Sequence, residues 1–309
     1  MRYERYETVF FYCRIGQFVA GFLETSSGTD KLQIVATTGM IGDAVAIIAG
    51  DKADVTVLMG PGVDPHLYKA TQGDLNALRS GDIIFYNGLH LEGKMQEVFD
   101  RLATTKKVFP VAAGIPESKL RTVAQVNGIS THDPHIWFDV QLWMLAVAEI
   151  GKQLSASDPT NAAFYATQTT KYLEQLAALD VFVKEKMSAI PETHRTLITS
   201  HDAFGYFGAA YGIRVKGLQG ISTAAEFGLK DITDMVNMII AEDIKAVFVE
   251  SSVSEKSIQA VIEGCHQKNH NIKAGGTLYS DAMGAAGTPE GNYIGMVTHN
   301  VEVIYAALK

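Results

Sequence analysis

The sequence is poor in cysteine, in positive charge and in long apolar runs, and each shortage excludes a class of protein. Its two cysteines, Cys13 and Cys265, lie far apart, so they build neither a disulfide framework nor a thiolate metal cluster. The formal net charge of −8 argues against nucleic acid as a partner, because proteins that bind it carry basic stripes. Beyond residue 30, no run is long and apolar enough to cross a bilayer.

Two common enzyme signatures are also missing. The segments 60–62 and 284–287 are rich in glycine, but neither gives the dinucleotide-binding fingerprint. The motif His-Glu-x-x-His of zinc hydrolases does not occur. The chain has 309 residues, of which 47% are hydrophobic and 19% charged. This is typical of a globular protein with a large core and more than one domain.

The first 30 residues differ in composition from the rest. Two apolar runs, at 9–12 and 18–23, are interrupted by Arg14 and Gln17, so the segment departs from an ordinary secretory signal. We interpret residues 1–30 as an atypical export segment and polar linker outside the fold.

The remaining chain shows two halves with the same plan, in which strand-like and helix-like segments alternate. In the first half we expect strands at 33–36, 55–58, 83–86 and 107–111, with helices at 41–49, 72–78 and 92–102. In the second half we expect strands at 196–199, 214–218, 246–249 and 271–274, with helices at 203–211, 229–241 and 255–268. The alternation predicts an α/β fold with two parallel-sheet (βα)n lobes.

A single long helix is predicted between the halves, over residues 158–190. Apolar side chains recur there at helical spacing, and no Gly or Pro interrupts residues 160–190. The expected domains are therefore an N-terminal lobe at 31–157, a linker helix at 158–190 and a C-terminal lobe at 191–309.

Four polar loops follow strand-like runs. The tripeptide Asp-Pro-His occurs twice and ends at His66 and His135, and two further loops carry His201 and Asp281. Ligands of open α/β sheets bind beyond the carboxyl ends of the strands, so two facing lobes would bring these four side chains into one cleft. Three imidazoles and a carboxylate are ligands that zinc accepts. A lone loop histidine is more often a surface residue; the repeated placement favours a metal site.

Several neighbouring side chains are candidates for supporting roles. Asp139, Asp202 and Glu250 could orient the ligating imidazoles, which usually donate their other N–H to an oxygen. Trp137 and Phe138 are expected to pack the wall of the cleft.

Three other histidines are weaker candidates for metal ligands. His90 is a possible fifth ligand, although we prefer a role at a helix start or beside the ligands. We expect His132 to be solvated, and His299 to be a core or surface residue.

At these loops the sequence resembles the TroA-like metal-binding receptors of ABC importers, a zinc/manganese family of solute-binding proteins with a helical linker. The resemblance extends from about residue 31 to the end and rests on the blocks 60–68, 86–92, 133–139, 201–207, 217–220, 250–252 and 280–284. It implies one divalent cation, Zn²⁺ or Mn²⁺, bound between two lobes. By matching position, the ligands would be His66, His135, His201 and Asp281.

The resemblance also implies the function: an extracytoplasmic protein that captures the ion as cargo and delivers it to an ABC permease, not an enzyme. His at the third ligand position, and a stretch at 112–131 without histidine, look TroA-like rather than like a dedicated zinc receptor. We expect a monomer, in the periplasm or on the outer face of the cytoplasmic membrane. Two alternatives stay open, a zinc-dependent hydrolase and a metal-containing adhesin.

Overall fold

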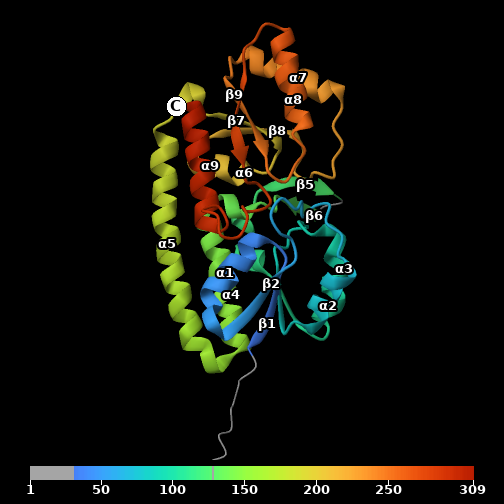
Figure 1. Cartoon of the computed structure of the whole chain (residues 1–309), viewed down its shortest axis with the longest axis vertical. Coiled ribbons are helices and arrows are strands. Elements are labelled where there is room, and N and C mark those ends of the chain that lie inside the picture. Colours follow the sequence, from blue (N-terminus) through green and yellow to red (C-terminus); the bar gives the residue numbers. More distant parts are fainter. Residues whose placement is uncertain (1–30, 127–128) are drawn as a thin grey trace, which may run out of the picture. The chain divides into compact units, whose positions relative to one another are not determined.

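A parallel four-stranded sheet forms the centre of the first half of the chain (Figure 1). The computed structural model describes residues 31–126 and 129–309, so the expected export segment lies outside the described residues. The strand order is β2-β1-β3-β4. The strands are β1 (Leu32–Ala36), β2 (Ala53–Val57), β3 (Ile83–Tyr86) and β4 (Lys107–Pro110).

Both faces of this sheet are covered because successive side chains of a strand point to opposite sides. On β1 and β3, Ile34 and Phe85 join the largest core cluster with helix α1 (Gly39–Ala49), whereas Val35 and Ile84 join a second cluster. That second cluster includes side chains from α2 (Gln72–Ser80) and α3 (Gln96–Ala103).

The second half is also built of parallel strands and helices, but its strands pair as two two-stranded sheets. β7 (Thr196–His201) pairs in parallel with β8 (Arg214–Gln219), and β9 (Ala246–Glu250) pairs in parallel with β10 (Lys273–Leu278). β7 lies beside β9. The helices are α6 (Gly205–Tyr211), α7 (Leu229–Ala241) and α8 (Lys256–Gln267). The α/β class with parallel sheets is thus confirmed.

One strand is displaced from its expected position. The sequence predicts a strand at 271–274, but β10 runs from Lys273 to Leu278, with an irregular register between Ala274 and Gly276. Gly275 and Gly276 interrupt the apolar pattern, and a β-carbon on Gly276 would lie 2.6 Å from Val303 of the last helix, α9 (Tyr293–Leu308). Glycine in a strand marks such a close approach.

The long helix is confirmed as α5 (Ala162–Ser188), preceded by a single 3₁₀ turn over Pro159–Asn161. It contacts α1, α6 and α9 as well as α4 (Val140–Ser157), and Figure 1 shows it running alongside α9. Its buried face includes Tyr165, Tyr172 and Leu176, as the spacing predicts.

Two elements were missed by the sequence interpretation. Helix α4 buries side chains at 140, 143, 147, 150 and 154, which is helical spacing, but this signal follows directly on the polar loop that carries His135. The antiparallel hairpin of β5 (Thr122–Val126) and β6 (Ile129–His132) interrupts the alternation of strands and helices.

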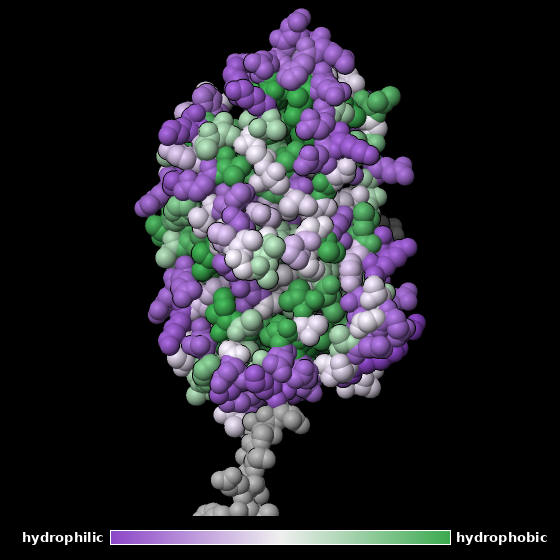
Figure 2. Space-filling model, in the orientation of Figure 1, coloured by the Kyte–Doolittle hydropathy of each residue, from purple (hydrophilic) through white to green (hydrophobic). Residues whose placement is uncertain are grey.

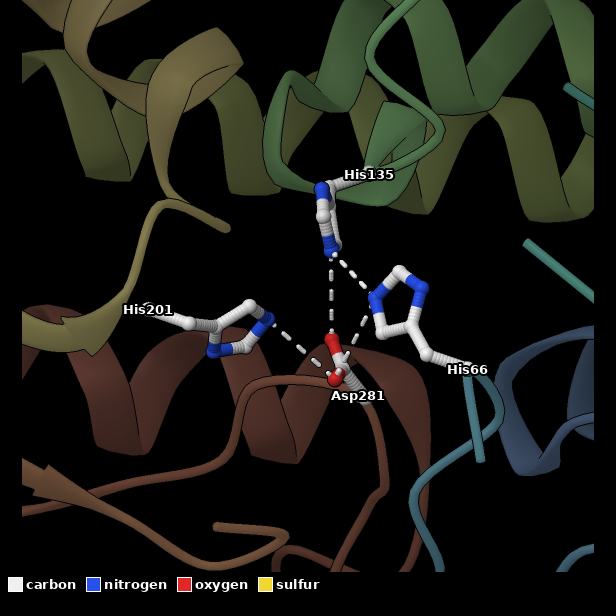
Figure 3. A group of neighbouring side chains, drawn as sticks. All are labelled: His66, His135, His201 and Asp281. Carbon is white, nitrogen blue, oxygen red and sulfur yellow. Dashed lines mark hydrogen bonds and ion pairs between the residues drawn. The ribbon is translucent and has the colours of Figure 1, made fainter. Parts of the chain in front are cut away.

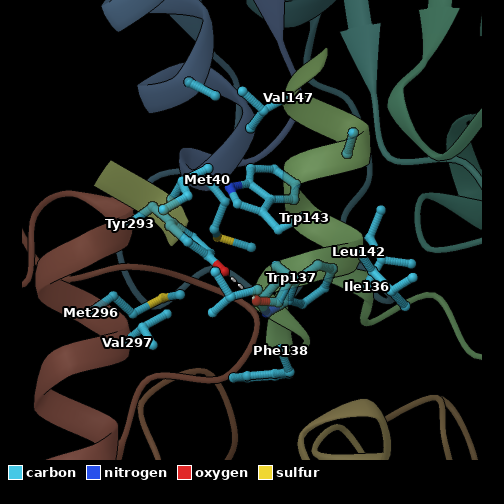
Figure 4. Packing of buried hydrophobic residues seen from close by; sticks show 14 of the residues in the cluster. Met40, Ile136, Trp137, Phe138, Leu142, Trp143, Val147, Tyr293, Met296 and Val297 are labelled. Carbon is cyan, nitrogen blue, oxygen red and sulfur yellow. Dashed lines mark hydrogen bonds between the residues drawn. The ribbon is translucent and has the colours of Figure 1, made fainter. Parts of the chain in front are cut away.

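The largest core cluster draws side chains from both halves and from α5, so it does not mark domain boundaries (Figure 4). The divisions at 157 and 190 therefore stay a prediction. Within the part of the chain that the structure describes, no helix has the length and apolar composition needed to cross a membrane. Figure 2 shows apolar residues gathered over α1 and β2, where a pocket of about 290 Å³ is lined by residues that include Val55, Val57 and Met283.

Candidate metal centre

The four predicted side chains come together from four separate loops and strand ends (Figure 3). His66 lies in the loop after β2, and His135 lies between β6 and α4. His201 is the last residue of β7, and Asp281 follows β10. One ligand atom from each lies within 4.8 Å of all the others, and all four residues are buried.

The spacing of the facing atoms suits a single small cation. Asp281 Oδ2 lies 3.3 Å from His201 Nε2 and 3.8 Å from His66 Nε2, and Asp281 Oδ1 lies 3.5 Å from His135 Nε2. The Nε2 atoms of His66 and His135 are 3.2 Å apart. Bonds of about 2.0–2.2 Å in a tetrahedron separate ligand atoms by roughly 3.3–3.6 Å. The arrangement can therefore hold one metal ion.

The polar atoms at the centre lack other partners among the described residues. Neither carboxylate oxygen of Asp281 nor Nε2 of His201 makes a hydrogen bond of good geometry there. Buried polar atoms are normally satisfied, because leaving them unpaired costs free energy. A cation between them would accept all of these lone pairs at once.

The surroundings shift the pKa values of the cluster in different directions. Burial lowers the pKa of His66 to about 4, with His135 and His201 acting in the same sense and Asp281 opposing. Burial also disfavours the charged form of His201, but the carboxylates of Asp281 and Glu250 outweigh it and raise the pKa well above its usual value. Burial would raise the pKa of Asp281, but His201 and the other imidazoles hold it well below its usual range.

The two Asp-Pro-His tripeptides form the same local turn. The side chain of Asp64 accepts a hydrogen bond from the backbone N–H of His66 at 2.8 Å, and Asp133 accepts one from the N–H of His135 at 3.0 Å. Aspartate readily closes such a turn across two residues, and proline restricts its backbone. The histidine is therefore presented from a stiffened loop.

Two carboxylates orient the imidazoles. Glu250 Oε2 lies 2.5 Å from Nδ1 of His201, as the sequence analysis proposed, and Asp133 Oδ1 lies 2.7 Å from Nδ1 of His135. Asp133 holds the proton of His135 on Nδ1 and leaves Nε2 free to bind metal. Glu250 and Nδ1 of His201 face each other as an ion pair without a hydrogen bond of good geometry. Asp133 was missed, although its place in the tripeptide was a usable signal.

The prediction of this role was wrong for the other two carboxylates, Asp139 and Asp202. Asp139 caps α4 by accepting hydrogen bonds from the N–H groups of Gln141 and Leu142. Asp202 orients neither His135 nor His201, because Asp133 and Glu250 already face their Nδ1 atoms.

The aromatic residues after His135 do pack the wall of the site. Trp137 is buried, its ring centroid lies 5.3 Å from that of His135, and its Nε1 donates to the carbonyl of Ser280 at 2.9 Å. Its own carbonyl accepts a hydrogen bond from the hydroxyl of Tyr293 at 2.7 Å (Figure 4). Phe138 is buried beside Phe204.

The remaining histidines lie outside the cluster. His90 is exposed and does not belong to the converging group, so the structure does not bring it forward as a fifth ligand. His132 was expected to be solvated, but its side chain is only 13% exposed and lies near Glu117. His299 packs beside Tyr279, as expected of a core or surface residue.

Comparison with known proteins gives a consistent result. The family model for the periplasmic zinc-uptake complex component A, ZnuA, matches residues 34–307. The chain is 49% identical over 298 residues to the manganese-binding lipoprotein MntA of Bacillus subtilis, covering 94% of this chain and 96% of that protein. It is 31% identical over 295 residues to PsaA of Streptococcus pneumoniae, a manganese ABC transporter substrate-binding lipoprotein, covering 94% and 93%.

A solved structure of a further metal-binding protein has a similar fold. The periplasmic zinc-binding protein TroA from Treponema pallidum superposes with a TM-score of 0.86 at 45% identity, over 90% of this chain and 99% of that chain. Since the family model matches nearly the whole described chain, this protein belongs to the ZnuA/TroA family of metal-binding components of uptake systems.

Proposed function

We propose that this protein captures one divalent transition-metal ion with His66, His135, His201 and Asp281 and delivers it to an ABC permease. The observation that carries the proposal is the convergence of four buried ligand atoms within 4.8 Å of one another. The ion is cargo, so the site must bind it tightly and then release it. We further propose that residues 31–157 and 191–309 act as two lobes on either side of α5.

The chemistry of the site supports Zn²⁺ or Mn²⁺ as the ion. Three imidazoles and one carboxylate are ligands that zinc prefers, and zinc lies above manganese in the general order of affinity. The relatives differ in this respect, since MntA is named for manganese and TroA for zinc. A site that binds zinc more tightly is compatible with manganese as the transported ion when manganese is more available.

The names of the relatives support a place of action and a partner. MntA and PsaA are named as lipoproteins and TroA as a periplasmic protein, which supports a position outside the cytoplasm for this chain. PsaA is named as part of an ABC transporter, which supports a permease as the partner. We propose that the protein acts as a monomer and, at a net charge of −8, does not bind nucleic acid.

The two alternatives, a zinc-dependent hydrolase and a metal-containing adhesin, are separated from the proposal by different observations. The relatives are named as binding proteins rather than as hydrolases, and two buried carboxylates beside the cluster, Glu250 and Asp133, already face His201 and His135. An adhesin that uses metal only as a structural element is separated from a transport protein by metal-dependent uptake in cells that lack the gene.

The test combines metal content with titration. Elemental analysis of protein purified without added metal should find one transition-metal ion per chain. Calorimetric titration of the metal-free protein should give one tight site, and loading should raise the melting temperature because the ion binds only the folded state.

A pair of variants links this binding to the cluster. His135→Ala should weaken binding by more than the roughly 10–100-fold that residues orienting a ligand typically contribute. His90→Ala is the matched control, since His90 lies outside the cluster, and should bind like wild type. Two equivalent ions, no ion, or wild-type affinity in His135→Ala would contradict the proposal.

A further inference from the structure

We propose that Arg121 is a positioning residue of the metal site, which fixes the orientation of His135 through Asp133 while it braces against helix α6 from the other half of the chain. The inference rests on the proposed function and adds to it a residue that does not touch the metal. Arg121 lies just before β5, in the first half of the chain.

The contacts form a direct line from Arg121 to the ligand. Asp133 is fully buried, and its two carboxylate oxygens face in different directions. Oδ1 lies 2.7 Å from the ring Nδ1 of His135, and Oδ2 lies 3.4 Å from Nη1 of Arg121. The backbone N–H of Asp133 also donates to the carbonyl of Arg121 at 2.9 Å. Rotation of the carboxylate away from the guanidinium would therefore also turn it away from the imidazole.

Helix α6 holds Arg121 from the opposite side. The hydroxyl of Tyr206 accepts a hydrogen bond from the backbone N–H of Arg121 and donates one to the carbonyl of Asp133, both at 3.0 Å. The guanidinium also lies over the ring of Tyr206, 5.7 Å from its centroid. One tyrosine thus joins the two residues that support His135.

Gly205 makes this arrangement possible. A β-carbon at Gly205 would lie 1.4 Å from Nη1 of Arg121 and 2.4 Å from its Cζ, so the guanidinium occupies the space that any other residue would fill. The absence of a side chain at Gly205 is a packing requirement of Arg121, which gives a way to displace the guanidinium without changing Arg121 itself.

Within the described ranges, the other two imidazoles lack such a support. The carboxylate that faces His201 belongs to Glu250, and among the described residues no Lys or Arg forms an ion pair with Glu250. At His66, the second oxygen of Asp64 accepts a hydrogen bond from the hydroxyl of Thr223 at 2.6 Å. Among the residues that the structure describes, this support occurs at His135, and it spans residues from both halves of the chain. A movement of α6 would therefore reach His135 directly.

The test reads the imidazole itself in metal-free protein. In wild type, nitrogen NMR of labelled histidines should show the proton of His135 on Nδ1, the ring nitrogen that faces Asp133. Arg121→Met should mix the two tautomers of His135, leave the nitrogen signals of His201 unchanged and weaken metal binding about tenfold, the lower end of the range for such supporting residues. Gly205→Ala should give the same pattern by displacing the guanidinium.

Arg195→Met is the matched control. Arg195 donates to the carbonyls of Ile190 and Ser188 and has no contact with the cluster in the described structure, so its loss should lower stability without changing His135. An unchanged His135 tautomer, or wild-type affinity, in both Arg121→Met and Gly205→Ala would overturn the proposal. So would equal changes at His135 and His201, which would indicate general loosening. The tautomer is read without metal, so a wild-type protein that bound no ion would refute the proposed function and leave this result interpretable.

Discussion

The indole of Trp137 donates a hydrogen bond of 2.9 Å to the backbone carbonyl of Ser280. Trp137 follows His135 by two positions, and Ser280 directly precedes Asp281, so one bond joins the loops that carry two of the four proposed ligands. Both residues are buried, and they lie 143 positions apart in the sequence. The bond fixes the distance between ligands from the two halves of the chain before any ion arrives.

Replacing Trp137 with Phe should therefore affect both stability and binding. The aromatic ring remains, but the carbonyl of Ser280 loses its buried donor, which costs about 1–3 kcal/mol of unfolding free energy. Metal affinity should fall about tenfold, as for other residues that orient ligands. Urea unfolding and calorimetric titration measure the two effects.

Trp143→Phe separates these effects. Trp143 is equally buried and stacks on Tyr293, but its indole N–H makes no hydrogen bond within the described structure, so it does not join the ligand loops. It should lose stability and keep wild-type affinity. Equal losses of affinity in both variants would show that the Ser280 bond has no special role.

Metal binding should release a proton from His201 at neutral pH. Asp281 and Glu250 raise the pKa of His201 well above its usual value, although burial opposes them, so the metal-free imidazole is protonated and must lose a proton to bind. His66, with a pKa of about 4, is already neutral and should release none. Titration in two buffers of different ionisation enthalpy gives the number of protons.

A variant tests whether the released proton comes from His201. Glu250→Gln removes one of the two carboxylates that raise the pKa of His201, so fewer protons should be released at the same pH. If wild type releases no proton at pH 7, the ion pairs around His201 do not control its protonation.

The stability of the metal-free protein should depend on His66 between about pH 6.5 and pH 4. Its pKa falls from 6.5 in the unfolded chain to about 4 in the folded protein, so only the unfolded chain takes up this proton in that window. Stability is lost as the pH falls, by up to roughly 3 kcal/mol from this residue. The pH dependence of stability that comes from His201 has the opposite sign. Its contribution to the stability of the folded protein is complete below pH 6.5 and is lost as the pH rises through its raised pKa.

Urea unfolding of wild type and His66→Gln at several pH values measures the contribution of His66. The variant should show a flatter dependence between pH 6.5 and 4. Curves of equal slope for the two proteins would count against the buried, neutral imidazole.

The converging residues could be predicted from the sequence because each lies near the carboxyl end of a strand. His66, His201 and Asp281 follow or end the parallel strands β2, β7 and β10, and ligands of such sheets bind beyond the carboxyl ends of the strands. Even the displaced start of β10 did not matter, since only its end positions Asp281.

The supports of the ligands could not be predicted in the same way. The two Asp-Pro-His tripeptides make the same local turn, yet only Asp133 reaches the ring of its histidine, whereas Asp64 accepts from Thr223. This difference depends on residues brought near by folding, Arg121 in one case and Thr223 in the other. Local sequence therefore predicts the turn but not what the carboxylate contacts.

The last prediction concerns the size of the change on metal loading. The carboxylate of Asp180, in the middle of α5, accepts hydrogen bonds from Tyr211 of α6 at 3.1 Å and from Gln141 of α4 at 2.9 Å, with Lys184 at 2.6 Å. A buried side chain thus ties the continuous helix to elements of both halves. Small-angle scattering of the metal-free and loaded wild type should therefore differ little, because bending requires this network to break.

Asp180→Ala should release that restraint. The orphaned partners should cost about 1–3 kcal/mol of stability, and the difference in scattering between the metal-free and loaded states should become larger than in wild type. Lys184→Ala is the control, since it removes an exposed partner of Asp180 and leaves the bonds to Tyr211 and Gln141 in place. A large compaction of wild type on loading, or an Asp180→Ala variant that scatters like wild type in both states, would show that α5 does not act as a strut.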